Sequence, residues 1–308
     1  MPQHSASPPD TAGSPPLALR HWVGWIGVGI GAAAARLPWP LQRAVGRGLG
    51  RLLKFAMPSR RRAARRNLEL CLPELDSAAR ERLLDASFDA LGIGAFEFAR
   101  AWWGDVAPMR RDLRIEGLEH LAALRAEGRG ILLVSGHFTT LELCGRLLCD
   151  HLELAGMYRL HDSAVMEWAV KRGRLRYASA MYTQDALRPV VKLLRSGGAL
   201  WYAPDQDMRG KDTVFAPFFG VPAATITATH QLARLTGCAV VPFFHRREGG
   251  RYVLRVAPPL PDFPGTDAEA DTARVNAAIE AMVREAPDQY LWIHRRFKRR
   301  PPGSPPLY

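Results

Sequence analysis

The sequence of 308 residues has only four cysteines, and none of them lies in a CxxC pair. This number and spacing exclude a disulfide framework and a cysteine-based zinc site. The sequence also lacks an HExxH zinc motif and a GxSxG nucleophile elbow. We therefore expect no metal, no protein nucleophile of the serine hydrolase kind, and four reduced thiols. The cysteines are Cys71, Cys144, Cys149 and Cys238.

No apolar run reaches the roughly 20 residues that a membrane-spanning helix needs. The longest one, residues 22–35, has fourteen residues and follows a Pro/Ser-rich tail over residues 1–16 that we expect to be disordered. We expect this run to anchor the protein to a membrane, either as a short span or as an interfacial helix extended through Leu41. The alternative is a buried hairpin of an ordinary soluble protein.

The sequence has fewer acidic than basic residues, with 30 Asp and Glu and 42 Lys and Arg, and its net charge is therefore +12. Such a field attracts anionic membranes, phosphorylated substrates and nucleic acids. The arginines of residues 59–66 come soon after the apolar run, which favours a membrane surface with this side in the cytoplasm. Because no known nucleic-acid-binding motif is present, a basic nucleic-acid-binding protein is the weaker alternative.

Helical periodicity covers residues 60–103, and apolar strands alternate with helices after that. This order indicates an α/β fold with a largely parallel central sheet flanked by helices and preceded by the anchor helix. We expect a disordered tail over 1–20, an anchor with a basic segment over 21–58, and the main domain over 59–308. The expected strands are 130–135, 153–158, 199–203 and 238–244, and the expected helices lie near 139–149, 162–174, 185–195, 225–236 and 267–286.

His137 lies directly beyond the first expected strand and five residues before Glu142. Ligands bind beyond the carboxyl ends of parallel strands, and Asp205 and Asp207 follow another strand in the same way. If a helix begins at Thr139, Glu142 can reach back to Nδ1 of His137 and leave Nε2 as a general base. Such a base, without a protein nucleophile, would activate a substrate hydroxyl. A capping box between Thr139 and Glu142 is the alternative without catalysis.

The stretch RGILLVSGHFTTLEL resembles the HxxxxD/E motif of the bacterial lipid A secondary acyltransferases, the lauroyl and myristoyl transferases of lipopolysaccharide assembly. Further blocks in the family's order include RRNLELCLPEL, WYAPDQD, VFAPFFG and QYLWIHRRFKRRP, so the resemblance covers nearly the whole chain. The lauroyltransferase branch is the most similar. Because YAPDQD stands where the wider glycerolipid acyltransferases have FPEG, an enzyme of that wider group is an alternative that the sequence disfavours.

The resemblance implies a glycerolipid acyltransferase-like fold and transfer of a fatty acyl chain from acyl carrier protein to a lipid A precursor. The acceptor would be a hydroxyl of a hydroxyacyl chain on this anionic glycolipid. The resemblance further implies no cofactor, no nucleic acid, and a place at the bacterial inner membrane with the catalytic domain on the cytoplasmic side. His137 and Glu142 would be the catalytic pair, and Arg174, at a position that is essential in the family, would stabilise the oxyanion.

Six further residues are candidates for substrate binding. Asp205 and Asp207 could order Arg174 or bind sugar hydroxyls, or they are simply turn-forming aspartates. Arg159 follows a strand and could line the cleft. Three basic residues near the C-terminus suit phosphate groups through bidentate contacts, with chance surface basicity as the alternative. These three are Arg295, Arg296 and Lys298.

Overall fold

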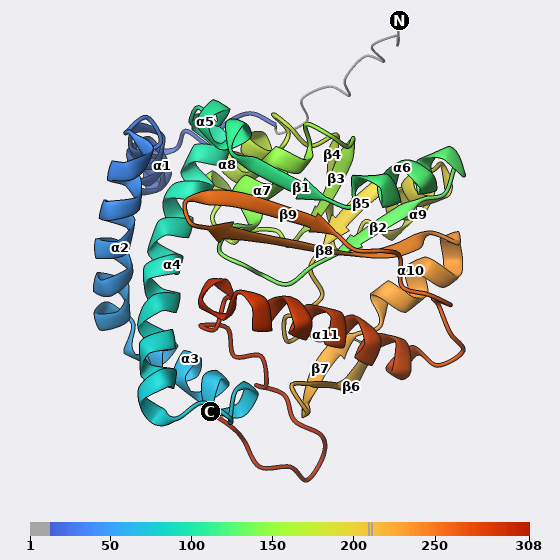
Figure 1. Ribbon diagram of the computed structural model, residues 1–308. Helices are drawn as coiled ribbons and strands as arrows, with labels where there is room; N and C mark the ends of the chain where they lie inside the picture. Colours follow the sequence, from blue (N-terminus) through green and yellow to red (C-terminus); the bar gives the residue numbers. More distant parts are fainter. Residues whose placement is uncertain (1–12, 209, 211) are drawn as a thin grey trace, which may run out of the picture.

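The computed structural model describes residues 13–208, 210 and 212–308, so most of the tail expected to be disordered lies outside the described residues. Seven strands form one sheet (Figure 1). The strands from β8 to β4 in the sheet order are parallel, whereas β9 is antiparallel to β8 and parallel to β1. The expected α/β fold with a largely parallel sheet is confirmed. In sheet order the strands are β1 (Leu113–Glu116), β9 (Arg251–Val256), β8 (Ala239–Glu248), β2 (Ile131–Val134), β5 (Ala199–Tyr202), β3 (Leu154–Tyr158) and β4 (Ala180–Thr183).

The four strands expected from apolar runs are β2, β3, β5 and β8, in the middle of the sheet. The sequence analysis did not predict β1 and β4, which lie at the two edges and are only partly buried, so neither is a continuous apolar run. It also missed β9 and a separate hairpin. The hairpin consists of β6 (Thr213–Phe218) and β7 (Val221–Ile226), so the helix expected from residue 225 begins only at Ala228.

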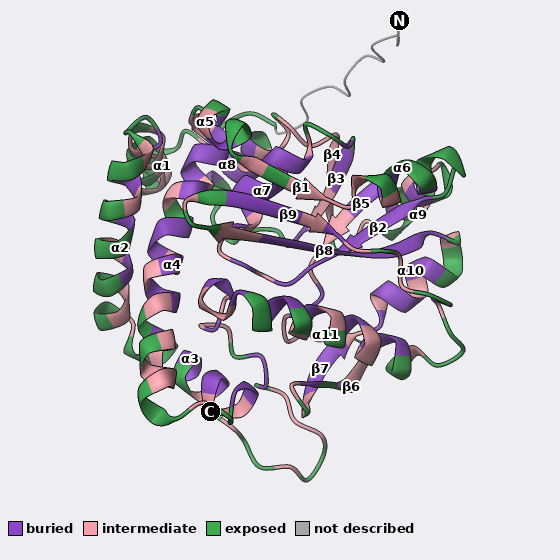
Figure 2. Cartoon of the chain, in the orientation of Figure 1, coloured by how far each residue is buried: buried purple, intermediate pink, exposed green. Residues whose placement is uncertain are grey.

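Alternate residues of β2 enter two hydrophobic clusters on opposite faces of the sheet. Leu132 and Val134 belong to one cluster, and Ile131 and Leu133 belong to the other. The long helix α4 (Ser77–Trp103) contributes to both clusters, and Figure 2 shows the strands buried between the helical layers. The first face carries α9 (Leu187–Arg195), α10 (Ala228–Thr236) and α11 (Ala268–Glu285), and the second carries α6 (Leu118–Ala126), α7 (Leu141–Leu148) and α8 (Ala164–Arg174).

The N-terminal apolar run forms α1 (Trp22–Ala34), which is shorter than expected. Pro38 stands before the next helix, and the residue before a proline disfavours helical geometry, so the helix does not continue through Leu41. Among the described residues, no helix is long and apolar enough to cross a bilayer, and the membrane-spanning form of the anchor is therefore not supported. The remaining helical elements are η1 (Leu19–His21), α2 (Trp39–Ala56), α3 (Pro58–Cys71), α5 (Ala107–Arg111) and η2 (Pro287–Gln289).

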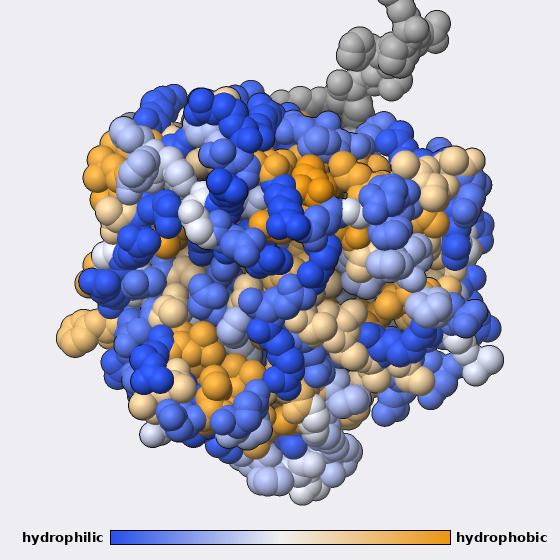
Figure 3. Space-filling view, viewed as in Figure 1, coloured by the Kyte–Doolittle hydropathy of each residue, from blue (hydrophilic) through white to orange (hydrophobic). Residues whose placement is uncertain are grey.

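One face of α1 packs on α8, and the opposite face is exposed. Trp25 meets Trp168 of α8 edge-on at 5.1 Å between the ring centroids. The exposed face consists of large apolar side chains whose exposed fractions are 58–82%. Figure 3 shows hydrophobic side chains along the left edge of the molecule, where α1 and α2 lie. The residues of this exposed face, called the α1 face below, are Trp22, Val23, Ile26 and Ile30.

Helix α2 lies directly against α4 because both helices have glycines at their contact. A Cβ atom on Gly92 of α4 would lie 2.0 Å from the carbonyl oxygen of Gly46 on α2. Any side chain at Gly92 would therefore push the two backbones apart. This close contact makes α2 part of the folded body, as Figure 1 also shows.

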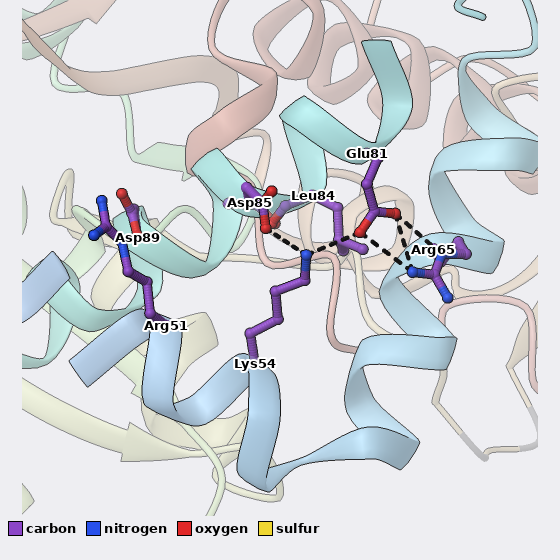
Figure 4. A network of polar contacts seen from close by, with 8 residues as sticks. Arg51, Lys54, Arg65, Glu81, Leu84, Asp85 and Asp89 are labelled. Carbon is purple, nitrogen blue, oxygen red and sulfur yellow. Dashed lines mark hydrogen bonds and ion pairs between the residues drawn. The ribbon is translucent and has the colours of Figure 1, made fainter. Parts of the chain in front are cut away.

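Acidic residues of α4 neutralise part of the basic N-terminal segment (Figure 4). Lys54 of α2 lies between Glu81 and Asp85, 2.8 Å from the first, and Arg65 of α3 is 3.0 Å from Glu81. These cations therefore hold helices together, and they contribute less to an anionic surface than the sequence suggested. Arg47 and Arg62 are exposed and have no ion pair among the described residues.

Candidate active site

His137 lies just beyond β2 at the carboxyl edge of the sheet, before α7 begins. Its Nδ1 is 2.5 Å from Oδ1 of Asp205, and its backbone N–H donates to Oδ2 of the same carboxylate at 2.8 Å. The two residues are 68 positions apart. They meet because Asp205 follows β5, the parallel neighbour of β2, and both strands end at the same edge.

Asp205 is fully enclosed, with 1% of its surface exposed. Burial alone would raise the pKa of its carboxyl group, but the charge on His137 and hydrogen bonds from His137 and Tyr290 bring that pKa well below its usual range. Tyr290 donates its hydroxyl to Oδ2 at 2.8 Å. The carboxylate is therefore ionised and holds the proton of the imidazole on Nδ1, which leaves Nε2 as the basic nitrogen.

The expected contact between Glu142 and Nδ1 of His137 is wrong, because Asp205 occupies that position. Helix α7 begins only at Leu141, and the Glu142 carboxylate points away toward α4 and α8. The capping box is also absent, since the helix has no side-chain hydrogen bond at its N-terminus.

Three donors from two other parts of the chain surround the Glu142 carboxylate. Arg174 donates from Nη2 at 2.7 Å and from Nε at 3.0 Å, Trp102 donates its indole N–H at 2.7 Å, and Tyr177 donates its hydroxyl at 2.6 Å. Burial acts to raise the pKa of Glu142, but the charge of Arg174 and these hydrogen bonds lower it. The structure thus replaces one expected pair by two: His137 with Asp205, and Glu142 with Arg174.

Three of these four residues line one cavity of about 390 Å³, and Asp205 lies buried behind His137. His137, Glu142 and Arg174 form part of its polar wall, and the side chain of His137 is 31% exposed. Arg159 and Asp207 also line the cavity. A basic imidazole and a fixed guanidinium at one cavity are suited to deprotonating a hydroxyl beside a developing negative charge.

Comparison with known proteins gives a consistent result. Residues 15–299 match the family described as bacterial lipid A biosynthesis acyltransferase. The chain is 39% identical over 292 residues to the lipid A biosynthesis lauroyltransferase of Escherichia coli K12, and 37% identical to the palmitoleoyltransferase of the same strain. Both alignments cover 94% of this chain and 95% of the relative. The E. coli K12 myristoyltransferase is 29% identical, over 92% of this chain and 90% of its own length.

The chain belongs to the bacterial lipid A biosynthesis acyltransferase family. It is an acyltransferase. The expected resemblance is confirmed.

Of the six further candidates, Arg296 lies in the interior of the acyltransferase. It is 3% exposed and donates to the carbonyl oxygen of Ala224 at 2.7 Å and to the hydroxyl of Thr225 at 2.6 Å. A phosphate group cannot reach a guanidinium that is buried and bonded in this way. The expectation that Arg296 binds a phosphate is therefore wrong, and the residue fixes β7 instead.

Asp207 is paired, whereas Arg295 and Lys298 stay exposed. The Asp207 carboxylate forms an ion pair with Arg299, and its backbone N–H donates to Nε2 of His294 at 3.0 Å. Within the described part of the chain, Arg295 donates only to the Ser59 hydroxyl, at 3.0 Å. Asp207 therefore orders the segment that follows β5, while the two exposed cations remain candidates for binding an anion.

The sequence analysis missed three residues of the site, namely Trp102, Tyr177 and Tyr290. Nothing in the spacing of Trp102 or Tyr177 relates them to Glu142, 40 and 35 residues away. The contact between His137 and Asp205 did have a signal, because both were expected just beyond parallel strands. What was missing was the strand order that makes β2 and β5 neighbours.

Proposed function

We propose that this acyltransferase moves a fatty acyl chain from the thioester of acyl carrier protein to a hydroxyl of a hydroxyacyl chain on a lipid A precursor. The main support is the geometry of His137, whose Nδ1 is held by an ionised carboxylate while its Nε2 is left for the substrate. The relatives named above differ in the acyl group that their names state, so the length of the chain transferred by this protein is a separate question.

In this reaction Nε2 of His137 removes the proton of the acceptor hydroxyl as its oxygen attacks the thioester carbon. A C–O bond forms and a tetrahedral oxyanion results. When the oxyanion collapses, the C–S bond breaks and the thiolate takes the proton from the imidazolium. Asp205 stabilises the imidazolium between these two steps, so neither an acyl-enzyme nor a cofactor is needed.

Arg174 is the best-placed donor for the oxyanion. The backbone N–H groups of His137, Phe138 and Thr139 donate to Asp205, Gly136 and Gln289, so none of them is available. Arg174 is held through Nε and Nη2 by Glu142, and its Nη1 has no hydrogen bond among the described residues. Burial would lower the pKa of Arg174, but Glu142 raises it, so the guanidinium stays charged.

The lipid acceptor suggests a position at the cytoplasmic side of the inner membrane, with the α1 face lying in the interface. Exposed apolar side chains beside basic ones are typical of interfacial helices. Helix α1 packs on the first turns of α8, the helix that ends at Arg174. Arg159, Arg295 and Lys298 are exposed cations that could bind the acceptor's phosphates. Changing all four residues of the α1 face to serine should weaken binding to anionic vesicles without loss of folding. Unchanged vesicle binding would place the membrane contact elsewhere.

The catalytic proposal is tested with purified protein, the acyl carrier protein thioester and the lipid A precursor, and the product is read by mass spectrometry. We expect His137→Ala and Asp205→Asn each to lower turnover about 10²–10⁴-fold, because both remove the oriented base. His161→Ala is the matched control, since His161 also lines the cavity and its imidazole has no hydrogen bond among the described residues. An Asp205→Asn enzyme with normal turnover would contradict the proposed pair.

A further inference from the structure

The cavity has an apolar arm that the acid–base chemistry does not use. Leu141 and Gly145 of α7 line it together with Cys149, the residue that caps the helix, and their spacing of four residues places them along one stripe. This stripe leads away from His137, because α7 starts at the carboxyl edge of the sheet and runs back across it. From Leu141 to Cys149 the backbone rises about 12 Å, at 1.5 Å per residue.

The opposite wall of the arm is strand β3. On the α7 side of the sheet its lining residues are Leu154, Gly156 and Tyr158, which cover about 13 Å at 3.3 Å per residue, while Ala155 and Met157 point to the other face. The α7 wall and the β3 wall therefore have about the same length. Both run from the carboxyl edge of the sheet, beside His137, to the opposite edge, which is the inner end of the arm. At the inner end of the arm the backbone N–H of Ser179 donates to the carbonyl oxygen of Leu154 at 2.9 Å, and Ala178 also lines the cavity. Cys149, Leu154 and Ala178 thus surround the inner end.

We propose that this arm holds the acyl chain that is transferred, and that the size of the side chain at Cys149 limits the length of that chain. The inference rests on the proposed function. It adds the part of the cavity in which the hydrocarbon lies and the residue that decides specificity. The mostly apolar wall of the arm begins beside His137 and extends about 12 Å along α7, which suits an extended alkyl chain whose thioester carbon lies at His137.

Two features of the wall make Cys149 the sensitive position. At Gly145 any side chain would collide with Trp201, since a Cβ atom there would lie 2.5 Å from the indole ring. Trp201 is itself held in place by a 2.9 Å hydrogen bond to Ser135. The middle of the arm is thus fixed, whereas a side chain at Cys149 can grow or shrink into the inner end. Burial raises the pKa of the Cys149 thiol to about 12, so the residue acts as a small neutral side chain.

The experiment is a competition in which the enzyme chooses among acyl carrier protein thioesters that differ by two carbons, with product masses as the readout. We expect Cys149→Phe to shift the products to shorter chains, with at least a tenfold loss for the longest chain that the unchanged enzyme uses. Cys149→Ala should shift the products toward longer chains. Cys144→Ala is the matched control, because Cys144 is a buried cysteine of the same helix that does not line the cavity. It should leave the distribution unchanged.

The outcomes separate the inference from the function on which it rests. Transfer with the same chain-length distribution in both Cys149 variants would overturn the inference and leave the proposed function intact. Equal loss for all chain lengths would also overturn it. If Cys149→Phe does not fold, as melting will show, Cys149→Ala still decides the question because it adds no volume. If the unchanged enzyme transfers no acyl chain from any thioester, the proposed function fails and the inference fails with it.

Discussion

Two buried clusters in this molecule have the same composition, one glutamate with one arginine and one tyrosine. In both clusters the arginine nitrogen is 2.7 Å from the glutamate, and the tyrosine hydroxyl donates to the same carboxylate. Both glutamates are almost completely buried, at 3% and 0% exposure. The cavity cluster is Glu142, Arg174 and Tyr177, and the core cluster is Glu97, Arg247 and Tyr252.

The clusters differ in the hydrogen-bond donors of the arginine that remain for a ligand. Arg174 lines the cavity and keeps Nη1 without a partner among the described residues. Arg247 lies in the interior, where Nη2 donates to Thr139 at 3.3 Å and its backbone is bonded twice to Gln289. The core cluster thus fixes α4 to β8 and β9. A buried ion pair is consequently no sign of function by itself, and access to the cavity is what distinguishes the two.

The largest effect should come from changing the arginines. Arg174→Lys keeps the charge but loses the planar fork, so we expect kcat to fall about 10²–10³-fold. Arg247→Lys should lower the melting temperature and leave kcat nearly unchanged. Steady-state kinetics of both variants would check this. Retention of most of kcat by Arg174→Lys, with a raised KM for the acceptor, would make Arg174 a binding residue.

A smaller effect should come from changing the glutamates. Glu142→Gln and Glu97→Gln each leave a buried guanidinium without its counter-charge, which costs about 2 kcal/mol of stability in either cluster. Only Glu142→Gln should also lower kcat, because the loosened arginine is the one at the cavity. Urea unfolding and turnover are measured on the same samples. A loss of turnover in Glu97→Gln that equals the loss in Glu142→Gln would remove the distinction between the clusters.

The smallest effect should come from changing His245, the histidine in the core, and not from His137 at the cavity. Burial and the charge of His137 lower the pKa of His245 to about 3. The pKa of the same histidine in the unfolded chain is about 6.5. At pH values between about 3 and about 6.5 the unfolded chain therefore binds a proton that the folded chain does not, so the free energy of unfolding falls as the pH falls. His245 should contribute up to about 1.4 kcal/mol per pH unit in this window.

His245→Phe should reduce that slope in urea unfolding between about pH 6 and pH 4. Part of the slope should remain, because burial also lowers the pKa of His294, to about 4. An unchanged slope in the variant would mean that His245 is not the group that titrates on unfolding.

Most of the central fold could be predicted from the sequence because buried parallel strands are continuous apolar runs. Edge strands such as β4 lack that pattern, because their residues are only partly buried. The N-terminal helix was identified, but its end was not, although Pro38 was a readable signal. Which neighbours a helix finds, as α1 does in Trp168, follows from tertiary packing and has no local pattern.

Only some of the residues of the site could be predicted, for a similar reason. Position beyond a strand identified His137, the family resemblance identified Arg174, and both line one cavity. The carboxylate that contacts Nδ1 of His137 is decided by the strand order. The spacing of five residues between His137 and Glu142 favoured Glu142, but in the sheet Asp205 lies beside the imidazole. Short spacings describe helices well, whereas a sheet brings together residues whose separation along the chain has no fixed value.

The position of β5 has a consequence for how this enzyme is made. β5 lies between β2 and β3, which both precede it in the chain. A nascent chain that stops before Ala199 therefore has two strands with open inner edges, and open edges pair with other chains. The same chain still lacks Asp205, so its histidine has no partner to orient it. Residues 199–205 thus both close the gap between β2 and β3 and complete the proposed catalytic pair, so a shorter polypeptide holds no oriented base with which to activate a hydroxyl.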